Sequence, residues 1–102
     1  MSNTETYYKP TAYAGTGAQD LLAIKDQHEA TVIVSGGASD DYSIVFSVDG
    51  QPLASKTTHT LLSGLSGDTG IVMEPGKTAV GLDITTNVSG SIQLEVRTNP
   101  RT

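Results

Sequence analysis

Residues 42–50, Tyr42-Ser43-Ile44-Val45-Phe46-Ser47-Val48-Asp49-Gly50, decide the fold class of this chain. Side chains alternate between the two sides of an extended strand, so one face meets a core and the other faces water or a partner. The expected core-facing side chains are those of Tyr42, Ile44, Phe46 and Val48. Asp49-Gly50 then favours the tight turn of a β-hairpin, because such turns need residues that accept a positive φ.

Two segments near the C-terminus repeat this alternation. The apolar positions are Val80, Leu82 and Ile84 in the first segment and Ile92, Leu94 and Val96 in the second. We expect the two segments to pair as a closing hairpin between Thr78 and Thr98, which turns at Asn87-Val88-Ser89-Gly90. The β-branched run Val32-Ile33-Val34 predicts a further, central strand.

No segment sustains the apolar spacing of an amphipathic helix. About seven or eight short strands, with turns every 8–12 residues or so, are typical of a sandwich or small barrel. We therefore predict an all-β fold. The expected architecture is a small antiparallel β-sandwich, jelly-roll or immunoglobulin-like, with about seven or eight strands and an extended N-terminal arm.

The composition predicts one domain with a thin core. The chain has 102 residues, of which 36% are hydrophobic, and it contains one Phe, no Trp and no Cys. A core made mainly of Val, Ile and Leu on a chain of this length favours burial of further surface by association with other subunits. The absence of cysteine excludes disulfides and thiolate chemistry.

Charge and the N-terminal sequence restrict the partners and the compartment. The net charge is −5, and the six Lys and Arg residues are scattered along the chain. Because phosphate contacts dominate nucleic-acid affinity, we expect no nucleic-acid partner, and for the same reason no anionic membrane partner. The first residues show neither the basic segment nor the apolar run of a signal peptide, so we expect synthesis in a reducing cytoplasm.

The first 19 residues differ from the rest, and we divide the chain into an arm of residues 1–19 and a β-sandwich domain of residues 20–102. The arm carries three of the four tyrosines, Tyr7, Tyr8 and Tyr13. Tyrosine combines a large contact area with a polar tip, so these three are candidate anchors on a neighbouring subunit. The alternatives are a loose terminus or a first strand packed on its own domain.

A search for chemistry finds isolated residues. His28 and His59 each lack a second metal ligand at a nearby position, and a zinc site needs several that converge. Asp40 and Asp41 precede the 42–48 strand, and Asp49 follows it more than about 20 Å away. We interpret these aspartates as turn caps. The sequence predicts no enzyme, no cofactor and no metal site.

The sequence resembles small all-β virion proteins of tailed bacteriophages, of the capsid decoration or stabilisation type or the tail accessory type. The similarity covers most of the chain as a pattern. Its elements are the Thr- and Tyr-containing arm, Val32-Ile33-Val34-Ser35-Gly36-Gly37, Phe46-Ser47-Val48-Asp49-Gly50, a Gly/Ser loop and the segment from Thr78 to Thr98. The resemblance implies repeated copies on a virion, commonly as trimers.

These observations lead to one expected function and one alternative. We expect a non-enzymatic virion structural protein, made in the host cytoplasm, that decorates or stabilises a phage capsid or is attached to its tail. Its partners would be capsid or tail proteins and further copies of itself, reached through Tyr7, Tyr8 and Tyr13. The alternative is a glycan- or receptor-binding β-sandwich module that uses its loops. Flat aromatic side chains, which commonly hold sugars, are scarce outside the arm.

Overall fold

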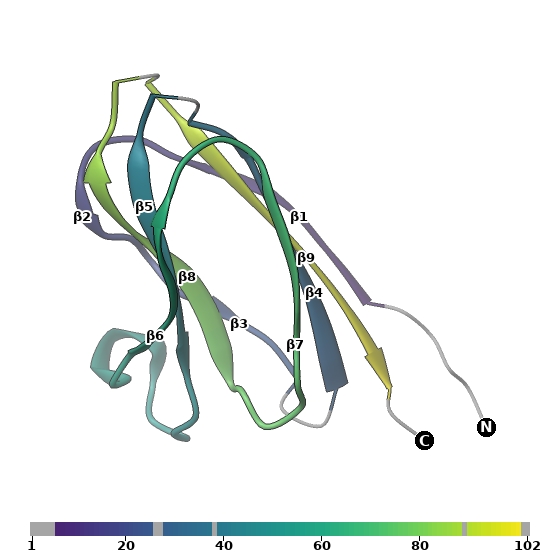
Figure 1. Ribbon diagram of the computed structural model, residues 1–102. Coiled ribbons are helices and arrows are strands. Elements are labelled where there is room, and N and C mark those ends of the chain that lie inside the picture. The colour runs from purple at the N-terminus through teal and green to yellow at the C-terminus, as the bar shows by residue number, and fades with distance from the viewer. Residues whose placement is uncertain (1–5, 26–27, 38, 89, 101–102) are drawn as a thin grey trace.

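The computed structural model describes residues 6–25, 28–37, 39–88 and 90–100, and these residues form two packed β-sheets (Figure 1). The strands are β1 (Thr6–Tyr13), β2 (Gly17–Ala18), β3 (Leu22–Ala23), β4 (His28–Gly36), β5 (Asp41–Ser47), β6 (His59–Leu65), β7 (Thr69–Met73), β8 (Ala79–Thr86) and β9 (Ile92–Pro100). A short 3-10 helix, η1 (Leu53–Ser55), lies between β5 and β6. Within the described ranges, no helix is long and apolar enough to cross a membrane.

The order of the strands defines a jelly roll. One sheet has the order β1-β9-β4-β7, and the other has the order β2-β8-β5-β6 with β3 also paired to β8. Because β2 and β3 both pair with β8, they are two parts of one interrupted strand. Counted this way, eight strands pair first with last, second with seventh, third with sixth and fourth with fifth. This nested antiparallel pairing confirms the predicted sandwich and selects the jelly roll.

The core lies between the two sheets, as the alternating segments predict. The fully buried large apolar side chains come from β4, β5, β7, β8 and β9: Val32, Val34, Tyr42, Ile44, Met73, Val80, Leu82, Ile84, Ile92, Leu94 and Val96. The prediction fails at one end of the 42–48 segment. Phe46 is only half-buried, and Val48 is 53% exposed because β5 ends at Ser47.

One hairpin prediction and one turn prediction are wrong. β8 and β9 belong to different sheets, so the expected closing hairpin is a crossing from one sheet to the other. Both strands line the same core from opposite sides, and their alternation looks the same in either arrangement. The Asp49-Gly50 turn is also absent: residues 48–58 connect β5 to β6, they include η1, and Gly50 does not have a positive φ.

The expected arm is, over residues 6–13, the edge strand β1 of the four-stranded sheet. β1 pairs with β9, and both described ends of the chain lie at the same end of the molecule (Figure 1). Tyr8 pairs with Val96 and Thr11 pairs with Leu94, so Lys9-Pro10 adds one residue as a bulge. Proline cannot donate a ladder hydrogen bond, and it is tolerated at such an edge position.

Candidate functional site

Aspartates stabilise the loops at one end of the sandwich. The buried Asp40 accepts a hydrogen bond from the backbone N–H of Val88 at 2.5 Å, which ties the β4–β5 loop to the β8–β9 loop. Asp68 accepts one from the N–H of Gly36 at 2.9 Å. Asp41, the neighbour of Asp40, is exposed. Asp40 and Asp68 therefore serve as the turn caps that loop aspartates commonly provide.

Asp49 organises the opposite end. Its carboxylate accepts hydrogen bonds from the N–H groups of Thr57 (2.9 Å) and Gln51 (3.1 Å). The bond from Thr57 is the main cause that lowers the pKa of Asp49, with Gln51 and Lys56 adding to it. The ammonium of Lys56 donates to the Asp49 carbonyl at 2.5 Å and to Thr78 Oγ1 at 3.2 Å. This end of the sandwich is held by a compact polar network.

The two histidines lie in different sheets. His28 begins β4 in the four-stranded sheet, whereas His59 begins β6 in the five-stranded sheet. The His59 ring lies 5.6 Å from the Phe46 ring, centroid to centroid. Within the described ranges, no group of three or more His, Cys, Asp or Glu side chains could hold a metal ion.

The structure separates the three arm tyrosines. Tyr13 is 9% exposed and belongs to the core, and its hydroxyl donates to the backbone carbonyl of Asp20 at 3.0 Å. Burial raises the pKa of Tyr13. Tyr13 thus takes the alternative position, in a strand packed on its own domain. Tyr7 and Tyr8 lie on edge strand β1, opposite Arg97 and Val96 of β9.

A groove lies on the outer face of the five-stranded sheet, and its floor is set by Val45 of β5. Val45 points away from the core, yet it is only 7% exposed. Its register partner on β8 is Gly81, which has no side chain. Leu21, in the β2–β3 connection, occupies the space above this glycine: a Cβ on Gly81 would stand 2.8 Å from Leu21 Cδ2. Leu21 therefore covers the middle of the sheet beside Val45.

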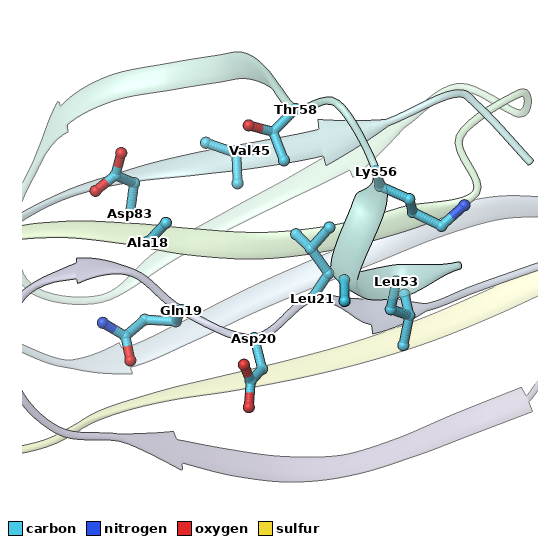
Figure 2. Close-up of a pocket in the computed structure, with 10 residues that line it drawn as sticks. Ala18, Gln19, Asp20, Leu21, Val45, Leu53, Lys56, Thr58 and Asp83 are labelled. Atoms are coloured by element: carbon cyan, nitrogen blue, oxygen red, sulfur yellow. The ribbon is translucent and has the colours of Figure 1, made fainter. Parts of the chain in front are cut away.

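The β2–β3 connection and η1 form the walls of this groove, which has a volume of about 620 Å³. Leu21, Val45, Leu53 and Ala54 provide its apolar surface. Ala18, Gln19 and Asp83 lie toward one end of the groove, and Leu53 and Lys56 lie toward the other (Figure 2). We call this the outer groove. It is an apolar surface with polar ends, and it suits an amphipathic ligand.

The exposed charged groups that line the outer groove are carboxylates. Lys56 lines it, but the Lys56 ammonium is bound within the Asp49 network, 3.6 Å from Asp49 Oδ1, and its side chain is 7% exposed. Asp83 projects from β8 and is exposed, and Asp20 on the β2–β3 connection is exposed as well. A ligand in the groove would meet carboxylates that have no neighbouring free cation among the groove residues.

The sequence contains two signals of this groove. Val45 is an apolar residue on the otherwise polar face of the 42–48 segment, and Gly81 is a residue without a side chain in the middle of a strand. Glycine inside a strand commonly marks a place where another part of the chain approaches closely. The approach of Leu21 could not be predicted, because it depends on the order of the strands.

Comparisons with known proteins support the fold. No family model matches the chain, and no curated protein matches it. The crystal structure of SPBc2 prophage-derived protein YomS is similar to it, with a TM-score of 0.56 and 10% sequence identity over 97% of each chain. A structure of Bacillus endospore appendages, described as disulfide-linked pili, aligns at a TM-score of 0.43 and 14% identity over 99% of this chain and 93% of that chain.

The first of these similarities confirms, at the level of the fold, the resemblance to small all-β phage proteins. At 10% identity it shows a shared fold alone. The second similarity is too low to carry an argument.

Proposed function

We propose that the chain is a non-enzymatic structural protein of a phage particle, which decorates or stabilises the capsid or is attached to the tail through protein–protein contacts. The observation that carries this proposal is the jelly-roll fold, which the chain shares over 97% of its length with a prophage-derived protein. The loop aspartates support a structural role as well, because Asp40, Asp49 and Asp68 cap backbone groups.

Exposed apolar side chains support contacts with other subunits. Among the residues that the structure describes, five such side chains are distributed over the connections, the strand edges and the groove wall: Val48, Leu53, Leu62, Val72 and Val88. Burial of such residues against a neighbouring subunit is favourable by about 25 cal/mol for each Å² of apolar surface. We propose that copies associate, with a trimer as the favoured state, and that they bind capsid or tail proteins.

The proposal assigns part of this contact to the beginning of the chain. β1 is an edge strand of the four-stranded sheet, so a neighbouring subunit can reach it from its open side. Tyr7 and Tyr8 on this strand are the proposed anchors, whereas Tyr13 belongs to the core.

The test is the protein composition of phage particles from the strain that encodes the chain. Particles would be purified by density gradient, separated into heads and tails, and analysed by quantitative mass spectrometry. We expect the chain in one of the two fractions at a copy number matching a repeated site of the capsid or tail. Its absence from both fractions would overturn the proposal.

A further inference from the structure

We propose that the outer groove binds a lysine or arginine side chain presented by a different protein subunit. The aliphatic stem of that side chain would lie on Val45 and Leu53, and its cationic head would meet Asp83. That the partner is a subunit of the same particle rests on the proposed function. The selectivity of the groove for a basic side chain is independent of it.

The apolar floor favours the stem of a long side chain. Val45, Leu21 and Leu53 contribute aliphatic side chains to the lining of a groove of about 620 Å³. Lys and Arg cover such surfaces with their methylene groups while the charged head reaches a polar edge. The groove combines this apolar floor with the carboxylate of Asp83 at one end (Figure 2).

The charges select a cation over a neutral or acidic side chain. Asp83 is exposed, and the one cationic side chain lining the groove, that of Lys56, is bound within the Asp49 network. The whole chain carries a net charge of −5, which attracts a basic surface and makes a second copy of the same acidic chain a poorer occupant of this groove, whatever contacts the copies make elsewhere. Charge therefore points to a different, basic protein as the occupant.

The test is a titration of the full chain, isotopically labelled, with short blocked peptides followed by amide chemical shifts. The probe is Ac-Gly-Thr-Arg-Thr-Gly-NH2, and its matched controls replace Arg by Gln, Leu or Glu. We expect the Arg peptide to shift the amides of Leu21, Val45 and Asp83 with a dissociation constant on the order of 1 mM. The Gln, Leu and Glu peptides should bind more weakly, and 0.5 M NaCl should weaken the binding of the Arg peptide.

Variants assign the effect to the groove. Asp83→Asn should lower the affinity for the Arg peptide about two- to fivefold, the range for one exposed ion pair. Leu53→Ser should lower this affinity by a similar factor, because part of the apolar wall of the groove is lost. Asp41→Asn removes an exposed carboxylate that does not line the groove, and it should leave binding unchanged.

Several outcomes would overturn the inference. These are equal binding of the Arg and Leu peptides, shifts outside the groove only, or equal weakening by Asp83→Asn and Asp41→Asn. Such results would leave the particle analysis untouched. If instead the Arg peptide binds as expected and the chain is absent from particles, the proposed function fails and the groove's selectivity stands.

Discussion

Leu21 lies over Gly81 so closely that a Cβ on the glycine would stand 2.8 Å from Leu21 Cδ2 and 3.5 Å from Leu21 Cα. The second distance is an ordinary van der Waals contact, so the side chain of Leu21 would have to move while its backbone could stay in place. This contact joins a strand of the five-stranded sheet to the segment that forms one wall of the outer groove. Among the described glycines, Gly81 is the one where an added Cβ would come closest to another atom.

Gly81→Ala should therefore lower the free energy of unfolding by about 1 kcal/mol, the low end of the usual cost of overpacking, because the tip of the Leu21 side chain can move aside. Urea denaturation would measure it. Gly70→Ala is the matched control, because Gly70 also lies in a strand but its added Cβ would meet no atom within 4 Å. We expect no loss there, and an equal loss in both variants would contradict the role given to Leu21. Adding Leu21→Ala to Gly81→Ala should relieve the clash, so the two effects should be non-additive.

Removal of the buried cap at Asp40 should destabilise the loop end of the sandwich. Asp40→Ala leaves the partly buried N–H of Val88 without its carboxylate acceptor, at a cost of about 1–3 kcal/mol. Asp41→Ala provides a control at the next, exposed position, where we expect a change within about 0.5 kcal/mol. Thermal and urea unfolding would measure the loss of stability in each of the two variants. Similar losses of stability in both variants would show that the hydrogen bond between Asp40 and Val88 does not stabilise the fold.

Tyr42→Phe should loosen the crossing between the two sheets at residues 66–68. The Tyr42 hydroxyl lies 2.6 Å from the Gly67 carbonyl, to which it donates, and 2.7 Å from Thr69 Oγ1. Loss of these bonds should cost about 1–3 kcal/mol. Hydrogen exchange should rise at Gly67 and Thr69 and stay the same at Val34. Tyr13→Phe, which loses one bond at 3.0 Å, should leave exchange at Gly67 unaltered.

Acid should remove a contribution of Asp49 to stability. The hydrogen bond from Thr57 is the main cause that lowers the folded-state pKa of Asp49 below its ordinary value of 3.8. A lowered folded pKa gives stability that is present above the unfolded pKa and is lost as the pH falls through the folded pKa. The free energy of unfolding, measured between pH 5 and about pH 2.5, should therefore fall less steeply for Asp49→Asn than for the parent chain. Identical slopes would exclude Asp49 as a source of the acid sensitivity.

Deletion of residues 1–19 should destroy the fold instead of releasing an arm. It removes edge strand β1, the paired residues of β2 and the core residue Tyr13. Loss of one large core aromatic alone costs about 3–5 kcal/mol, a large share of the stability of a small domain. Deletion of residues 1–5 keeps every described strand and is the control. Circular dichroism and light scattering would compare the two, and a folded monomer after the longer deletion would contradict the strand assignment.

The sequence predicts the strand faces well and the strand partners poorly. Ile44, Leu82 and Leu94 are buried as their alternation indicates, because a period of two fixes which side chains share a face. Alternation carries no information about which strand lies alongside, so the predicted hairpin between β8 and β9 is wrong. Asp49-Gly50 has the composition of a tight turn, but Asp49 caps Thr57 across a longer connection.

The outer groove depends on contacts that no local pattern contains. Val45 is buried on the outer face, where Leu21 lies over Gly81, the register partner of Val45. The burial of Tyr13 also depends on distant residues. Its neighbours in sequence resemble a polar extension, whereas its ring lies in the core because β1 pairs with β9. In both cases residues far apart in sequence decide the burial.

The pairing of the first strand with the last has a consequence for the synthesis of this protein. β1 pairs with β9, so its partner is the last strand of this fold to leave the ribosome. Until then β4 also lacks β9, and the four-stranded sheet cannot close. Long-range pairings of this kind are slow and expose unpaired edges. The nascent chain must therefore keep its apolar strands from associating with other chains until β9 has been synthesised.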